Sequence, residues 1–478
     1  MTMKAMGKIR HIASVLAFAG LCTIASAQNM RTGYFMDGYA YKFKMNPAMA
    51  SSRSFVALST LGNLNLGVES NLGLSSICYP KQDGSGLTTF LNSEVDAATA
   101  MSKFSKKNYA NLNTDLSLVS FGFWGKSGRM FHNVDISLNA SAYSSLPYDL
   151  FRFAKVGSAN GNNVFDLSDT RVSAESYLSI AYGFSLPIVK NVRFGARAKL
   201  LLGIAMADAS LKGTSLTTGA DEWYAVTDGS LNANLPMAMK LPINEKGYVD
   251  WDNIGSDYDI KNIGSSFGSI GAAVDLGVTV DFLEDFTASA SVTDLGFISW
   301  NNYISASAVK GPDGNAKKTV VASGSESTDF SQVGDKLLEC LDFAVDENGV
   351  KKATMLRPTL YVGLQYRMPF YRRMSVGVLS TTKIAGTYTW SEGRLALNID
   401  PTDWFSFGTN YAYSIFGHSA GVALSFHLTG FNFFIGTDSY VPLLNVTPQF
   451  VPINRLNTSV TCGFNIMFGR YNGRYATK

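Results

Sequence analysis

The chain has 478 residues, of which 16% are charged, against about 25% in an ordinary globular domain. Its formal net charge of +3 is too small to indicate nucleic acid as a partner. Four cysteines are too few for a disulfide framework, whereas 44 glycines and 12% aromatic residues favour a chain whose outer surface contacts lipid.

The first 27 residues have the pattern of a secretory signal peptide. Basic residues precede an apolar run over 12–24, and Ala25-Ser26-Ala27 follows as a cleavage site. The run is too short to span a membrane, so we expect residues 1–27 to be removed on export.

Residues 28–53 form a polar, irregular segment without the alternation of a strand. Pro47 fixes its own φ and biases Asn46 towards an extended conformation, which suits a chain that enters a confined space. We predict that this segment is a plug inside a barrel, and the alternative is an arm in the periplasm.

From residue 54 onwards, apolar and polar side chains alternate with the period of two that is typical of strands. Fourteen such segments can be marked: 54–66, 115–125, 131–143, 172–186, 192–206, 267–281, 286–293, 358–367, 374–382, 386–399, 404–413, 418–428, 430–438 and 456–468. Every second connection is six residues or shorter, and most of the others are long. This sorting predicts an all-β fold, a transmembrane antiparallel up-and-down barrel of about 14 strands with long extracellular loops. A short helix is predicted in one of these loops, at 146–155.

Charged residues within the strands indicate the face that lines the lumen. Arg193, Arg197 and Lys199 share one face of the segment 192–206, and a cation facing lipid would cost about 2–4 kcal/mol. We therefore expect these cations inside the barrel, with Asp275 of the next strand as a partner. The network is predicted to be structural and to hold the plug around Asn46 and Pro47, and the alternative is an anion-attracting constriction.

No residue pattern predicts catalysis. Gly417-His418-Ser419-Ala420-Gly421 matches G-x-S-x-G, but that motif needs a strand, a turn and then a helix, and here a strand follows. Ser419 and His427 lie about 26 Å apart along that strand, at ~3.3 Å per residue. We predict a non-enzyme with no catalytic residue, no metal site and no cofactor. Whether Cys78 and Cys340 form a disulfide is left open.

Several stretches resemble a family of uncharacterised Bacteroidota outer-membrane barrels and, more distantly, the FadL/PorV type. They include Leu61-Gly62-Asn63-Leu64-Asn65-Leu66-Gly67, Leu146-Pro147-Tyr148-Asp149-Leu150 and Gly430-Phe431-Asn432-Phe433-Phe434-Ile435-Gly436. Asn46-Pro47-Ala48 is similar to an element of the FadL-type plug. The FadL resemblance implies fourteen strands and passage of hydrophobic molecules, whereas the PorV resemblance implies a role in protein secretion.

The expected domains are the signal peptide 1–27, the plug or periplasmic segment 28–53, the barrel 54–469 and a tail 470–478. We expect a barrel in the outer membrane of a Gram-negative bacterium that passively transports hydrophobic or amphipathic small molecules. The alternative is a scaffold or accessory barrel for secretion or assembly-complex proteins. Expected partners are outer-membrane lipid and a small ligand or such proteins, with no nucleic acid. Transport requires a pocket that reaches a gap in the wall, and a scaffold would show exposed apolar loops.

Overall fold

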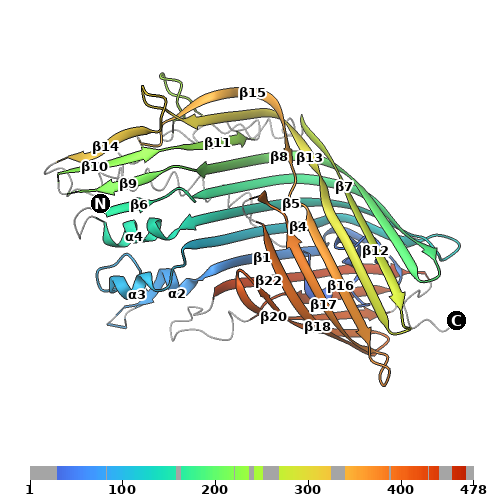
Figure 1. The fold of residues 1–478 in the computed structure, drawn as a ribbon. Coiled ribbons are helices and arrows are strands. Elements are labelled where there is room, and N and C mark those ends of the chain that lie inside the picture. The colour runs from blue at the N-terminus through green and yellow to red at the C-terminus, as the bar shows by residue number, and fades with distance from the viewer. Residues whose placement is uncertain are drawn as a thin grey trace.

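The computed structural model describes residues 29–81, 83–84, 86–157, 163–219, 221–235, 242–250, 268–323, 340–386, 389–428, 430–440 and 455–469. The predicted signal peptide at 1–27 and the tail at 470–478 lie outside these residues. The described part of the chain forms a tilted barrel that is extended at one end by loops with their own secondary structure (Figure 1).

Fourteen strands of the described residues close into a ring in which each strand pairs with its neighbours in the chain, and the last strand pairs with the first. All of these pairs are antiparallel, which confirms the predicted up-and-down barrel. The ring contains β1 (Ser54–Gly73), β4 (Lys107–Trp124), β5 (Phe131–Pro147), β7 (Arg171–Val189), β8 (Val192–Leu211), β12 (Ser269–Phe282), β13 (Phe286–Ala308), β16 (Thr359–Arg367), β17 (Met374–Lys383), β18 (Trp390–Thr402), β19 (Phe405–Ser414), β20 (Gly417–Leu428), β21 (Phe431–Thr437) and β22 (Arg455–Phe468).

Between the described strands, six short connections lie at one end of the ring, where β1 begins and β22 ends, and the β17–β18 and β19–β20 connections at the opposite end are also short. We call the end with six short connections the turn end, and the opposite end the loop end. Several strands continue further towards the loop end than predicted: β4 starts at Lys107 rather than 115, and β13 runs on to Ala308 rather than ending at 293. In these extra parts the backbone hydrogen bonds between strands continue, but apolar and polar side chains no longer alternate clearly. Alternation in the sequence therefore identifies only the part of each strand that has one apolar face.

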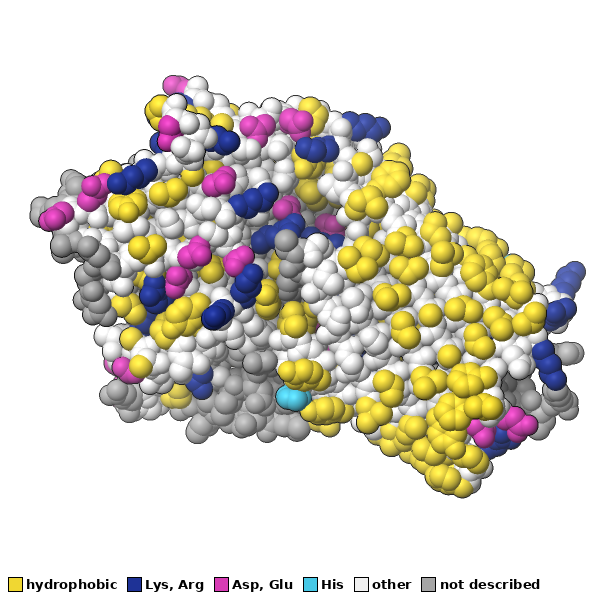
Figure 2. All heavy atoms as spheres, in the orientation of Figure 1, with side chains coloured by type: hydrophobic (Ala, Val, Ile, Leu, Met, Phe, Trp, Pro, Cys, Tyr) yellow, Lys and Arg dark blue, Asp and Glu magenta, His cyan; other side chains and the backbone are white. Residues whose placement is uncertain are grey.

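The outer face of the ring carries an apolar belt. On β16, Leu360, Val362 and Leu364 are exposed while Tyr361 and Gly363 point inwards and are buried. Figure 2 shows hydrophobic side chains covering the barrel wall and thinning towards the loop end. Among the described helices, none is both long enough and apolar enough to cross a membrane.

The wall is higher on one side at the loop end because two further strands extend it. β11 (Gly229–Asn234) lies between β8 and β13, the position that β12 occupies nearer the turn end. β15 (Phe343–Met355) continues along β13 where β16 stops. At this change of partner Asp294 has φ +62°, and its backbone N–H donates to Asp275 Oδ1 at 2.8 Å.

The loops carry small elements of their own. These are α2 (Leu74–Ile77), β2 (Cys78–Pro80), β3 (Leu87–Thr89), α3 (Ala97–Met101), α4 (Tyr148–Val156), β6 (Asn163–Asp166), β9 (Ser215–Thr218), β10 (Glu222–Thr227) and β14 (Lys317–Ser323). Strands β14, β10, β9 and β6 form one sheet in that order. The helix predicted at 146–155 corresponds to α4, which places Phe151 in one small hydrophobic core and Phe153 against another.

Candidate functional site

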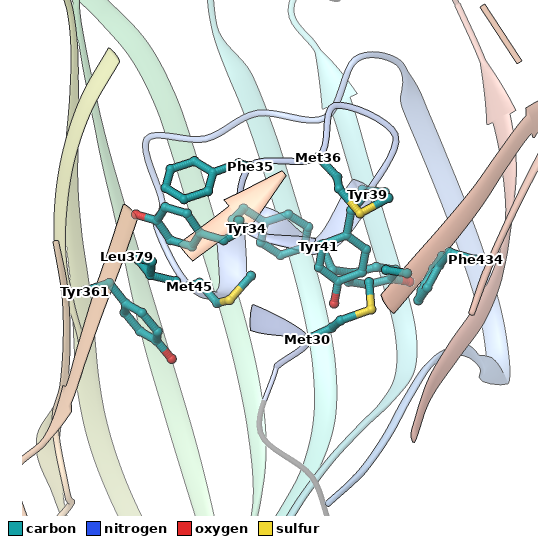
Figure 3. Close-up of a cluster of buried hydrophobic side chains, with 14 of the residues drawn as sticks. Met30, Tyr34, Phe35, Met36, Tyr39, Tyr41, Met45, Tyr361, Leu379 and Phe434 are labelled. Atoms are coloured by element: carbon teal, nitrogen blue, oxygen red, sulfur yellow. The ribbon is translucent and has the colours of Figure 1, made fainter. Parts of the chain in front are cut away.

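The N-terminal segment lies inside the ring and contacts strands on opposite sides of it. It contains two short 3₁₀ turns, η1 (Arg31–Gly33) and η2 (Ala40–Lys44). Figure 3 shows its aromatic and methionine side chains between opposite walls of the barrel. Tyr34 stacks with Tyr361 of β16, and Tyr39 packs edge-on against Phe434 of β21.

Glycines on the inner face of the wall make room for these side chains. A Cβ on Gly377 would come within 2.6 Å of the Phe35 ring, and one on Gly408 within 2.6 Å of Met36 Sδ. Real Cβ atoms do not approach that closely, so a larger residue at either position would displace the Phe35 or Met36 side chain. Part of the high glycine content therefore serves the contact between wall and segment.

Asn46 and Pro47 occupy a notch in the inner wall. Gly195 of β8 lies directly opposite Gly277 of β12 in the ladder. A Cβ on Gly195 would overlap the backbone of Pro47, and one on Gly277 would overlap the Asn46 side chain. Asn46 Oδ1 accepts the backbone N–H of Ala48 at 3.0 Å, which folds the segment into a turn at this notch.

Serines next to the notch satisfy the backbone of the segment. Ser185 Oγ on β7 donates to the Ala48 carbonyl at 2.7 Å, and Ser291 Oγ on β13 donates to the Met45 carbonyl at 2.7 Å. The sequence analysis expected the nearby cations to hold this part of the segment instead. A serine bonds a carbonyl without bringing a charge out of water, which explains why neutral side chains hold the segment here.

The predicted lumen cations Arg197 and Lys199 both reach Asp275. Arg197 Nη1 lies 3.2 Å from Asp275 Oδ2, and Lys199 Nζ lies 2.8 Å from Oδ1 of the same carboxylate. Lys199 also pairs with Asp294 at 2.7 Å. The guanidinium of Arg197 lies over the Phe43 ring, 5.2 Å from its centroid, so this cluster touches the segment.

Lys44 extends the same network from the segment to β4 and β5. Its Nζ lies 2.6 Å from Asp115 on β4 and 3.0 Å from Asp135 on β5, and Arg197 lies 3.9 Å from Asp135. The pairs form a continuous row of alternating charge across β4, β5, β8, β12 and β13. Mutual pairing of this kind is the arrangement expected of a structural network rather than of a constriction that attracts anions.

Arg193 stands apart from this network, near the turn end. Its Nη2 donates to Ser185 Oγ at 3.0 Å and to the Ser185 carbonyl at 3.2 Å. Its guanidinium lies 5.4 Å from the centroid of the Trp124 ring. Ser185 donates a hydrogen bond to the Ala48 carbonyl, so Arg193 contributes to holding the segment at the notch by positioning the Ser185 side chain.

A second ionic cluster, which sequence reasoning missed, holds the other end of the segment. Arg31 pairs with Glu69 at 2.6 Å, with Glu392 at 3.3 Å and with Asp438 at 3.5 Å. Arg394 pairs with Glu392 at 2.8 Å and with Asp438 at 3.6 Å. Burial alone would lower the pKa of Arg31, but the three carboxylates raise it above its ordinary value.

Asp438 also receives the backbone of the segment. Its carboxylate accepts the N–H groups of Arg31 and Thr32 at 3.1 and 2.7 Å, together with the Thr32 hydroxyl at 2.6 Å. Burial favours protonation, but Arg394, Arg31 and these hydrogen bonds hold the pKa of Asp438 below its usual value of 3.8. A signal for this cluster was present in the sequence, since Glu392 and Arg394 are two residues apart and therefore share the lumen face of β18.

Two cavities lie on the loop side of the segment and share Glu175, Leu356 and Arg357 in their walls. The inner one, about 90 Å³, is mainly polar and reaches Asn29. The outer one, about 520 Å³, has both apolar and charged lining. Its lining residues are Arg171, Ser173, Ala174, Glu175, Met206, Asp208, Asn232, Tyr303, Thr354, Met355, Leu356, Arg357, Pro358, Ile384, Ala385 and Gly386.

The chemical motifs considered from the sequence are not assembled into a reactive site. Ser419 is buried on the inner face of β20, which continues as an unbroken strand to Leu428. Within the described ranges, no three His, Cys, Asp or Glu side chains are grouped to hold a metal ion. Cys78 on β2 is a free thiol, and Cys340 packs into the core of the sheet that contains β10.

A model described as a family of unknown function (DUF5723) matches residues 47–438. No curated protein matches the chain. Among solved structures, the chain is similar to the Ralstonia pickettii toluene transporter TbuX, with 8% identity, 91% of this chain and 95% of that chain covered and a TM-score of 0.39. It is also similar to a Pseudomonas aeruginosa FadL homologue, with 9% identity, coverages of 94% and 98% and a TM-score of 0.40.

Proposed function

We propose that this chain, which belongs to the family of unknown function DUF5723, is an outer-membrane barrel for passive transport of amphipathic small molecules. Location in a membrane is supported by the apolar belt, because a contiguous apolar surface of this size would be unstable in water. A closed barrel leaves no strand edge exposed to lipid, and is one of the two folds able to span a bilayer.

The outer cavity is the observation that carries the transport proposal. It lies at the loop end, where the height of the wall changes. On one side β15 continues along β13 beyond the end of β16, and on the other side the chain turns back between β17 and β18. Met355 and Leu356 border it on one side and Ile384 on the other, and Met355 and Ile384 are 74% and 47% exposed. An apolar rim around a cavity with charged groups suits a molecule with one apolar and one polar end.

The polar end of the cavity leads towards the lumen. Arg357 Nη2 donates to Ser173 Oγ on β7, and Lys383 Nζ donates to Asn113 Oδ1 at 3.3 Å in the wall of the inner cavity. On the face in Figure 2, charged side chains gather where the apolar belt ends. These groups offer hydrogen bonds to a solute that moves from the rim towards the segment.

Residues 28–53 serve in this proposal as the plug that closes the route. Met30–Ala48 are almost entirely buried and contact the wall on all sides, so a solute can pass only if part of the segment moves. Deleting residues 30–50 should raise single-channel conductance in planar bilayers while the barrel still forms. Unchanged conductance would remove the plug from the proposal.

Transport is tested by influx of N-phenylnaphthylamine, an apolar fluorescent amine, into cells of a heterologous Gram-negative host that expresses the protein. We expect faster influx than in cells with an empty vector, and slower influx for Ile384→Glu, which places a charge on the cavity rim. Ile243→Glu is the matched control, since Ile243 is also exposed but does not line the cavity. Influx equal to that of the empty vector would contradict the proposal.

A scaffold role in a secretion or assembly complex is the second candidate. It is favoured by exposed apolar side chains around β2 and β3 at the loop end, namely Leu74, Ile77, Leu87 and Leu91. Gentle detergent extraction followed by mass identification separates the two functions. A stoichiometric protein partner that is lost on Leu87→Ser would favour the scaffold.

A further inference from the structure

The turn end carries an apolar arc over three neighbouring turns. Ile188 at the end of β7, next to the β7–β8 turn, is 60% exposed, Leu283 in the β12–β13 turn 76%, and Phe370 in the β16–β17 turn 78%. The turns are adjacent, since Asp281 N–H donates to the Asn191 carbonyl and Arg367 N–H donates to the Asp285 carbonyl, both at 2.8 Å.

The backbone at Leu283 is unusual for a residue of its size. Leu283 and Glu284 have φ +47° and +58°, the left-handed region that hairpin turns normally fill with Asn, Asp or Gly. A bulky side chain disfavours this conformation, and packing compensates little for it because most of the Leu283 side chain is exposed. The β12–β13 turn therefore has a strained backbone at Leu283 and Glu284 and an exposed apolar side chain at its tip.

The arc is continuous with the apolar belt. Above these turns the outer face of β16 and β17 carries exposed Leu364 and Val378, and Figure 2 shows hydrophobic side chains down to the lower right end of the barrel. Arg372 Nη2 pairs with Asp285 at 3.0 Å, so one pair of charges is compensated between two turns of the arc, and Lys190, Asp281 and Glu284 are exposed in the same turns. The β4–β5 turn differs because its exposed residues, Lys126, Ser127, Gly128 and Arg129, include no large apolar side chain, whereas the turns of the arc combine apolar and charged ones.

We infer that the apolar arc (Ile188, Leu283 and Phe370) is immersed in the lipid leaflet at the turn end, while the β4–β5 turn stays in water. The partner of this surface is the phospholipid interface, because the arc adjoins the apolar belt and its turns also carry exposed Lys190, Asp281 and Glu284, a mixture of apolar and charged side chains that suits the headgroup region. The barrel would then sit deeper on the β12–β17 side. That tilt moves the rim formed by Met355 and Ile384, on the same side of the ring, towards the opposite leaflet.

The test uses the full mature chain in phosphatidylcholine liposomes, with Cys78, Cys340 and Cys462 replaced by alanine. A single cysteine is introduced as Phe370→Cys, Leu283→Cys or, as the control, Ser127→Cys, and is labelled with the fluorophore NBD. Heat-modifiable migration in electrophoresis confirms that each barrel is folded. We expect shallow doxyl-labelled lipid to quench positions 370 and 283 at least twofold more than position 127, and aqueous iodide to show the reverse order.

Equal iodide quenching at all three positions would place the arc in water and overturn the inference. A second measurement in native outer-membrane vesicles addresses a protein partner. If positions 370 and 283 are shielded there but open to iodide in pure lipid, a protein covers the arc and the lipid assignment is wrong. Neither measurement depends on whether the barrel transports a solute.

Discussion

Replacing Gly195 with alanine should unseat the middle of the N-terminal segment without disturbing the ladder of the barrel. The added Cβ would overlap the Pro47 backbone, which cannot rotate away as a flexible side chain could. Displacement breaks the hydrogen bonds from Ser185 to Ala48 and from Ser291 to Met45. At about 1 kcal/mol for each bond and a similar amount for the Asn46 contacts, the loss is about 2–3 kcal/mol. The unseated fraction should rise about 30- to 140-fold, at 1.4 kcal/mol per tenfold change.

Limited trypsin digestion of the folded barrel measures this fraction, because Lys42 and Lys44 are buried in the seated segment. Cleavage after these lysines should be faster in Gly195→Ala by the same factor. Gly393→Ala is the matched control, since a Cβ there meets no atom within 4 Å. If both variants are cleaved at the wild-type rate, the notch does not hold the segment and the reasoning fails.

Further predictions concern the ionic clusters, the topology and the absence of catalysis. Arg31→Met should destabilise the folded barrel by about 3–5 kcal/mol, seen as a lower temperature of heat-modifiable migration, because three buried carboxylates lose a shared partner. Asp438 has a lowered folded pKa, so its stabilising effect is complete above 3.8 and is lost as the pH falls through the folded value. Cleavage of the segment by pepsin, which is active in acid, should therefore rise below pH 3.8, and Asp438→Asn should show fast trypsin cleavage already at pH 7. Protease added to intact cells should cut within 207–266 or 294–357, and cuts confined to 126–130 would invert the topology. Ser419→Ala should leave cells unchanged, and an esterase activity abolished by this change would contradict the prediction of a non-enzyme.

The strands were predictable because alternation is a local property of the sequence. Each of the fourteen marked segments corresponds to one strand of the ring. β11 and β15 were missed, since both extend the wall beyond the apolar belt, where no apolar face is required. In β15, the residues from Asp346 to Lys352 are charged or polar and mostly exposed. Their sequence has the composition of a loop and does not predict a strand.

The interior was predictable only in part. Cations on a lumen face must find partners, and this argument led from Arg197 and Lys199 to Asp275. It could not find Arg31 and Asp438, which are 407 positions apart, because no local pattern relates residues at that separation. The glycines of the notch were counted in the composition, but their purpose depends on which segment lies against them.

The Arg31 cluster has a consequence for the order in which the protein assembles. Glu69 lies on β1 and Asp438 directly after β21, and the two come together only when β22 pairs with both strands. The segment therefore cannot complete its contacts until the last strand has closed the ring. The contacts of the segment with β4, β5, β7 and β13 do not depend on this closure, so the Arg31 cluster is the part of the interior that reports whether the ring is closed.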